Sequence, residues 1–259
     1  MLAREPAVAG VFYPENPIPL QHQIDDMLSS RQGLPLIPKA LIVPHAGYIY
    51  SGPIAASAYR LLQDQAHKIR RVVLLGPSHQ VAFRGIAAPE EGLFQTPLGN
   101  ISIDRQSIRQ LQSQNLINVR SDAHRWEHSL EVQLPFLQRV LGEFALLPLV
   151  VGDASPQEVA NALRASWGGE ETLIVVSSDL SHYHPYSEAR QIDRETSAMI
   201  ESLNGTLNGE QACGCRAVNG LLTLAQEKQL SITTLDVRNS GDTAGDRDRV
   251  VGYGAYALC

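Results

Sequence analysis

Cysteine is scarce in this chain of 259 residues, which contains only Cys213, Cys215 and Cys259. An odd set of three cysteines is not the disulfide framework on which small secreted domains depend. A chain of this length can bury enough apolar surface to be stable without disulfides. The scarcity of cysteine therefore favours a reducing compartment, and we expect a cytoplasmic protein.

Other absences exclude whole classes of protein. No apolar stretch approaches the roughly 20 residues of a membrane span, and the N-terminal segment lacks the apolar core of a signal peptide. The net charge is −6 and no Lys/Arg-rich run occurs, so nucleic acid is not an expected partner. A Walker-type phosphate loop, a nucleophile elbow and a Rossmann glycine fingerprint are also missing. We expect neither a membrane protein nor a nucleic-acid-binding protein.

What the chain has instead is a regular alternation of apolar runs and helical patterns. Continuous runs, typical of strands buried on both faces of a parallel sheet, occupy 39–44, 71–76, 145–151 and 172–177. Shorter strands are expected at 83–89 and 99–103, with two final strands at 230–237 and 249–258. Helical patterns cover about 21–30, 53–62, 104–114, 129–141, 155 onward, 186–202 and 214–228. We predict a single three-layer α/β/α domain over 1–259, with a mostly parallel but mixed central sheet.

Several residues refine these predictions locally. Pro53 and Pro156 are expected near the first positions of their helices, and Asp104 is expected to cap the helix that follows it. Pro135 is predicted to kink the helix over 129–141. The acidic, glycine-rich stretch 239–248 is predicted to be a mobile surface loop.

Three of the apolar runs are followed directly by histidine. His45 and His79 each follow one run, and Asp179 and His182 follow another. Ligands of open α/β sheets bind at the carboxyl ends of the strands. Histidine is the commonest metal ligand and a proton shuttle near neutral pH. The pattern therefore predicts one shared polar site at that edge of the sheet.

Asp179 and His182 are three residues apart, so they would share a face if their segment began a helix. A carboxylate beside histidine fixes its tautomer and raises its basicity. Asp179 could instead serve only as a helix cap.

Two other groups of residues are ambiguous from sequence. Glu127, His128 and Glu131 could lie near the site, or Glu127 could cap a helix while Glu131 faces solvent. Cys213 stands at a predicted helix N-terminus, where the pKa of a thiol is lowered, but a buried structural thiol is equally compatible with the pattern. Cys213 and Cys215 are too closely spaced for an ordinary zinc knuckle, and the role of Cys215 stays open.

The chain resembles the Memo family, whose bacterial and archaeal members are also called AmmeMemoRadiSam system protein B. The similarity extends in family order over nearly the whole chain, through Arg4–Pro14, Pro44–Gly52, Leu75–His79, Glu127–Pro135, Ser177–His182, Ala212–Gly214, Asn239–Asp242 and Val250–Ala255. The resemblance implies a fold similar to that of class III extradiol dioxygenases, which are non-haem iron enzymes. One departure is the stretch after Gly214, where Cys215-Arg-Ala-Val replaces the family's usual Arg-x-Pro-like sequence.

The resemblance also implies a set of site residues. Its two histidines and one cysteine fall on His45, His79 and Cys213 as metal ligands, and its nearby Asp and His fall on Asp179 and His182 as catalytic residues. A thiolate in place of the dioxygenase carboxylate makes a softer ligand set, which is better suited to copper or zinc and still able to hold iron. We expect iron or copper, with zinc as a further candidate. The resemblance further implies a small-molecule or peptide ligand and, in microbes, a radical-SAM protein partner.

Two functions of different classes are compatible with these residues. The first is a metal-dependent oxidoreductase in which His182 is the acid or base and Asp179 orients it. The alternative is a non-catalytic module that binds a peptide or partner segment in the same pocket.

Overall fold

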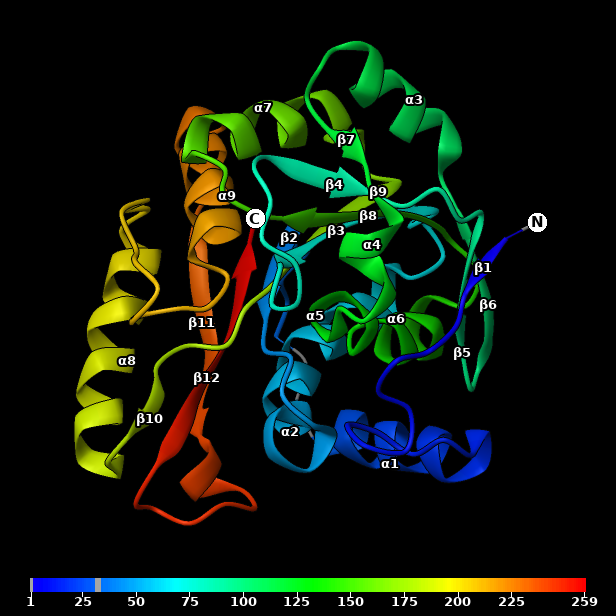
Figure 1. The fold of residues 1–259 in the computed structure, drawn as a ribbon. Helices are drawn as coiled ribbons and strands as arrows, with labels where there is room; N and C mark the ends of the chain where they lie inside the picture. Colours follow the sequence, from blue (N-terminus) through cyan, green and yellow to red (C-terminus); the bar gives the residue numbers. More distant parts are fainter. Residues whose placement is uncertain (1, 31–33) are drawn as a thin grey trace.

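The computed structural model describes residues 2–30 and 34–259 (Figure 1). Within these ranges twelve strands form one mixed sheet, with helices on both sides, which confirms the predicted three-layer α/β/α arrangement. The strand order is β1-β5-β6-β8-β3-β9-β2-β12-β10, with β11 paired to β12 and β4 paired to β7 and β8.

The elements have the following bounds. The strands are β1 (Ala3–Arg4), β2 (Ala40–Val43), β3 (Arg71–Pro77), β4 (Ile86–Ala88), β5 (Leu93–Thr96), β6 (Gly99–Ile103), β7 (Asn118–Val119), β8 (Ala145–Val151), β9 (Thr172–Ser177), β10 (His182–His184), β11 (Ile232–Asn239) and β12 (Val250–Leu258). The helices are α1 (Pro17–Ser29), α2 (Tyr48–Tyr59), α3 (Arg105–Ser113), α4 (Ser121–Arg125), α5 (His128–Glu131), α6 (Leu134–Leu141), α7 (Pro156–Ser166), α8 (Tyr186–Glu201) and α9 (Cys215–Glu227). Two 3-10 turns, η1 (Arg60–Gln65) and η2 (Ser240–Asp242), complete the list.

The centre of the sheet consists of β8, β3, β9 and β2, which are parallel neighbours. Helices α7 and α9 lie on one side of these strands, and α2, α5 and α6 lie on the other (Figure 1). Because both faces are covered, almost every residue of the four strands is buried, which is why they are continuous apolar runs. At one side of this core β12 runs antiparallel to β2, and β11 runs antiparallel to β12, so the sheet is mixed.

Two helices differ from the sequence prediction at a proline. Helix α2 begins at Tyr48, and Pro53 lies inside it rather than at its start. Tyr48 and Gly52 are buried in the core, so tertiary packing extends the helix upstream of the proline. The helix predicted over 129–141 is two helices, α5 and α6, and Pro135 stands in the first turn of α6. Proline cannot donate to the carbonyl four residues earlier, so it separates two helices here instead of kinking one.

Two other segments also differ from expectation. Residues 178–181 are irregular and His182–His184 is a strand, so Asp179 and His182 are not in the first turn of a helix. The stretch 239–248 begins with the last residue of β11 and with η2, where Asn239 and Ser240 are buried, so its start is part of the packed structure.

Candidate metal centre

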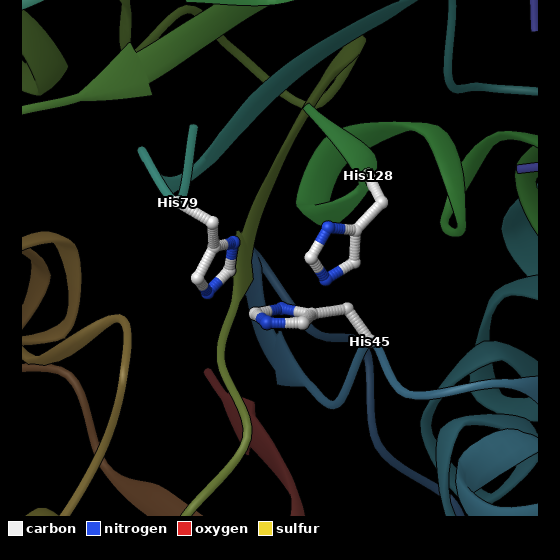
Figure 2. Close-up of side chains that lie close together, drawn as sticks. All are labelled: His45, His79 and His128. Atoms are coloured by element: carbon white, nitrogen blue, oxygen red, sulfur yellow. The ribbon is translucent and has the colours of Figure 1, made fainter. Parts of the chain in front are cut away.

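The predicted convergence of three strand ends is present in the structure. Strands β3, β9 and β2 are adjacent and parallel, so they end at the same edge of the sheet. His45 follows β2, His79 follows β3, and Asp179 follows β9. His128, the first residue of α5, joins them, and Figure 2 shows the three imidazole rings turned toward one another.

The distances among these side chains are compatible with a metal ion. One nitrogen each from His45, His79 and His128 lies within 4.8 Å of the other two. Cys213 lies next to His45, with its Sγ 3.3 Å from His45 Nε2. The structure thus brings His45 and His79 together with His128, and it places Cys213 beside His45.

The hydrogen bonds around His45 determine its tautomer. Ser177 Oγ donates its single proton to the carbonyl of Ser129 at 2.6 Å, so it must accept from His45 Nδ1 at 2.9 Å. It also accepts from Gln133 Nε2, whose amide is fixed because Nε2 donates to Pro44 O and Oε1 accepts from Tyr59. His45 therefore carries its proton on Nδ1, and its Nε2 lone pair faces Cys213.

Glu127 performs the same function for His79. Its Oε1 is 2.9 Å from His79 Nδ1, and its Oε2 accepts the backbone N–H of the same residue at 2.6 Å. Glu127 also accepts from Ser129 N and so caps α5, which was one of the two interpretations of its sequence context. A carboxylate that accepts a hydrogen bond from Nδ1–H leaves Nε2 of His79 free to bind a metal.

Burial and neighbouring charges shift the pKa values of these groups in different directions. Burial, reinforced by the nearby His79 and His128, lowers the pKa of His45 well below its usual value. Burial also lowers the pKa of His79, but the hydrogen bond and charge of Glu127 outweigh it and raise that pKa overall. Burial raises the pKa of Glu127, and its bond to His79 outweighs this and brings it to about 2. The site thus combines a neutral His45 with a more basic His79.

Cys213 has a different environment from the one its sequence context suggested. Helix α9 begins two residues later, at Cys215, and burial raises the pKa of the Cys213 thiol. The predicted lowering by a helix N-terminus is therefore wrong for the metal-free protein. A bound metal cation would instead be the group that favours the thiolate.

Asp179 and His182 both line the site but do not form the predicted pair. Asp179 Oδ1 accepts the backbone N–H of His45 at 2.7 Å, and burial raises the pKa of this carboxyl. His182 Nδ1 lies 2.9 Å from the carbonyl oxygen of Leu180, which can only accept. The Leu180 carbonyl, rather than Asp179, therefore sets the tautomer of His182.

A cavity of about 740 Å³ opens over these residues. The three histidines, Asp179 and His182 lie in its wall, and aromatic side chains form much of the remainder, namely Phe12, Tyr50, Tyr183 and Tyr253. Asp246, from the stretch predicted to be a surface loop, also lines it, together with Arg249, which directly follows that stretch. Sequence reasoning missed these wall residues because no local pattern brings Phe12 near residue 246.

The other candidates have structural or peripheral positions. Glu131 is fully buried 2.7 Å from Arg4 Nη1 and also accepts from Ala7 N, Val8 N and Tyr13 Oη, so it neither lines the cavity nor faces solvent. Cys215 lines a separate cavity of about 620 Å³ that Cys213 also borders. His184 interacts with Glu188 near the surface.

Comparison with known proteins agrees with this geometry. A family model described as "Memo-like protein" matches residues 4–257. The chain belongs to the Memo-like protein family. A MEMO1 family protein of Aquifex aeolicus is 38% identical over 98% of each chain, and one of Sulfolobus acidocaldarius is 34% identical over 97% of this chain and 98% of its own.

One solved structure of low sequence identity has a similar fold. An uncharacterized Escherichia coli K12 protein, JW3007, superposes with a TM-score of 0.51 at 13% identity, covering 84% of this chain and 99% of its own. At that identity the likeness concerns the fold alone. In the part of the Memo-like chain that the structure describes, no helix is both long and apolar enough to cross a membrane.

Proposed function

We propose that this chain is a metal-dependent redox protein whose ion is bound by His45 Nε2, His79 Nε2 and Cys213 Sγ. The observation that carries the proposal is the fixed tautomer of both histidines. Ser177 and Glu127 accept hydrogen bonds from the two Nδ1–H groups, so each ring has its Nε2 lone pair available before a metal binds.

The distance between Cys213 and His45 supports this ligand set. Two ligands of a tetrahedral ion, with bonds of roughly 2.0–2.3 Å, lie about 3.5 Å apart. The observed 3.3 Å between Cys213 Sγ and His45 Nε2 is close to that value. These two atoms can therefore bind one ion with little movement.

The rings of His79 and His128 are not oriented to bind one ion together, and Glu127 orients His79 at 2.9 Å, so Cys213 rather than His128 is the proposed third ligand. The rings of His79 and His128 are stacked, with centroids 4.6 Å apart and planes only 20° apart. Imidazole lone pairs lie in the ring plane, so two nearly parallel rings do not direct theirs at one point. His45 and His79, by contrast, have planes 74° apart, which allows their lone pairs to converge.

The proposed donor atoms are compatible with a small group of transition metals. Two imidazoles and a thiolate suit iron or copper, and a His₂Cys set also occurs at catalytic zinc. Iron or copper would supply one-electron redox chemistry to the site. The aromatic walls contributed by Phe12, Tyr50 and Tyr253 suit a small ligand with an apolar ring.

His182 is the proposed proton donor and acceptor. Its Nδ1–H is engaged by Leu180 O, so Nε2 is the nitrogen free to exchange a proton with a ligand in the cavity. Asp179 holds the backbone of His45 in place through a 2.7 Å hydrogen bond and adds a carboxyl group to the cavity wall. Both residues would act beside the metal rather than as its ligands.

Cobalt(II) binding tests the ligand set. A cobalt–thiolate bond gives a near-ultraviolet charge-transfer band, so Cys213→Ser should remove the band and His128→Ala should keep it. His45→Ala and His79→Ala should lose the ion altogether. Retention of the band in Cys213→Ser would show that a different thiolate binds the ion, and its loss in His128→Ala would make His128 a ligand, so either result would overturn the proposed ligand set.

Turnover is tested on the same variants. The iron- or copper-loaded protein should consume oxygen in the presence of a reductant or a catechol. His182→Ala should retain the metal but lose about 10²–10⁴-fold in rate, as expected for a general acid or base. Loss of metal from His182→Ala would make His182 a ligand and overturn the division of roles.

A specific observation also supports a peptide-binding function. Val11 and Tyr183 line the cavity and are 79% and 62% exposed, so the rim presents apolar side chains to solvent. Peptide affinity without any turnover of the metal-loaded protein would favour this second candidate.

A further inference from the structure

The segment that carries His182 has an unfavourable backbone conformation. Tyr183, the next residue, has φ of +62°, in the left-handed region that non-glycine residues rarely adopt. Such a conformation persists only where the surrounding structure holds it in place. The contacts that hold residues 180–182 therefore determine where His182 lies.

Two sets of hydrogen bonds hold this segment. Leu180 N donates to Gly252 O, and Gly252 N donates to Ser181 O, both at 2.8 Å. From the other direction, Oδ1 of Asp193 on α8 accepts the backbone N–H of Ser181 at 3.0 Å. Ser181 is thus fixed between β12 and the carboxylate of Asp193.

The side chain of Asp193 packs directly against the backbone of β12 at Gly252. A Cβ atom at position 252 would lie 2.1 Å from Asp193 Oδ2, so only glycine allows the carboxylate to reach Ser181. Asp193 itself is 2% exposed. Among the described residues it has no ion-pair partner within 4.0 Å, and burial raises the pKa of its carboxyl.

A buried carboxylate without an ion pair is costly unless hydrogen bonds hold it. We propose that Asp193 positions His182, by fixing the Ser181 backbone from behind the cavity, and is thus a positioning residue of the metal centre. It is not among the residues that line the cavity over the three histidines. The inference rests on the proposed function only in that His182 is the group that exchanges protons there.

Nitrogen NMR of histidine in the metal-free protein tests this role. The His182 signals, assigned with His182→Gln, should report the Nδ1–H tautomer in the wild type. Asp193→Ala should lose that preference and give a mixture of tautomers. Asp193→Asn should keep it, because an amide oxygen still accepts from Ser181 N. Glu195→Ala, which removes an exposed carboxylate from the same helix, is the matched control and should match the wild type.

Gly252→Ala disturbs the same contact while retaining the carboxylate, and it should also lose the tautomer preference. It keeps the test decisive if Asp193→Ala does not fold. Cobalt affinity should stay within about 3-fold of wild type in every folded variant, while kcat should fall about 10-fold or more in Asp193→Ala and Gly252→Ala.

Two other outcomes would overturn the positioning role of Asp193 or the proposed function. If Asp193→Ala and Gly252→Ala lower the melting temperature but leave the His182 spectrum unchanged, the role of Asp193 is structural and the inference is wrong. If the wild-type protein binds no cobalt, the proposed function fails instead, and the spectra still decide whether Asp193 positions His182.

Discussion

Individual residues of this site are prepared by hydrogen bonds that come from outside the cavity. Ser177 lies at the end of β9, and Glu127 directly precedes α5, yet they determine which nitrogens of His45 and His79 are available. Because both imidazoles are directed before any ligand binds, little reorganisation is needed on binding.

The pairing of Glu127 with His79 predicts the pH dependence of metal binding. Glu127 raises the pKa of His79, so the Nε2 lone pair is lost to protonation at a higher pH than in an ordinary histidine, whose pKa is about 6.5. Metal affinity should fall as the pH decreases through the neutral range. Glu127→Gln should move this fall to lower pH and weaken binding about 10–100-fold at high pH.

Cobalt titrations between about pH 5 and 8 measure both effects. Glu188→Gln is the matched control, because Glu188 contacts His184 at 3.0 Å in a similar pairing outside the cavity wall. Identical pH midpoints for the wild type and Glu127→Gln would refute the assignment of His79 as the proton-competing ligand.

The buried Arg4–Glu131 pair is expected to affect the stability of the protein but not its metal binding. Both side chains are buried and 2.7 Å apart, so Glu131→Gln leaves a buried charge uncompensated and should destabilise the protein by about 3–5 kcal/mol. The exposed pair of Asp25 with Arg139 should contribute less than about 1 kcal/mol when Asp25 is changed to Asn. Urea unfolding gives both values. Unaltered cobalt stoichiometry in folded Glu131→Gln is expected, and its loss would place Glu131 in the site.

Close packing of α5 on β3 places His128 beside the proposed ligand His79. Gly76, three residues before His79, faces Ser129 and Leu130, which directly follow His128. Without a side chain at position 76, the two elements come close enough for their histidines to stack. The spacing of the two rings is therefore set by an element contact.

Gly76→Ala tests that contact. A Cβ atom there would lie 2.8 Å from Ser129 Oγ and 2.9 Å from Leu130 Cδ2, so these side chains or α5 itself must shift. Overpacking of this kind costs about 1–3 kcal/mol, and we expect weaker cobalt binding as well. Gly209→Ala is the control, because a Cβ atom at position 209 meets nothing within 4 Å. Equal stability and affinity in the two variants would contradict this account of the packing.

For the molecule as a whole, we expect the buried sheet to keep the protein folded when no metal is bound. The four central strands are buried on both faces by helices, and the candidate ligands lie only at one edge of them. Chelation should therefore leave the far-ultraviolet circular dichroism unchanged, in contrast to small zinc domains that unfold without their ion.

Metal binding should nevertheless raise the melting temperature. A free metal concentration of 100 times Kd stabilises the folded state by about 2.7 kcal/mol, which for a chain of this size corresponds to about 5–11 °C. Differential scanning calorimetry with and without chelator measures this shift. Unfolding upon chelation would show that the metal is structural instead.

Much of the fold was determined by local patterns in the sequence. Continuous apolar runs identified β3, β8 and β9, because strands buried on both faces have no polar alternation. Ser155 and Asp104 cap the predicted helices through their own side chains, a contact that spans only three residues. His45, His79 and Asp179 could be placed at one sheet edge because parallel neighbours end on the same side.

Only the tertiary structure decided which histidine nitrogens are free at the candidate site and which residues hydrogen-bond to the histidines. The tautomer of His45 depends on Ser177 and Gln133, and the position of His182 depends on Asp193 and Gly252, all of them distant in sequence. The same holds for Glu131, which local spacing could not distinguish from a solvent-facing or site residue and which pairs with Arg4. Periodicity reports which face of an element is buried, but hydrogen-bond partners across the fold are fixed by packing, and the chemistry of this site depends on those partners.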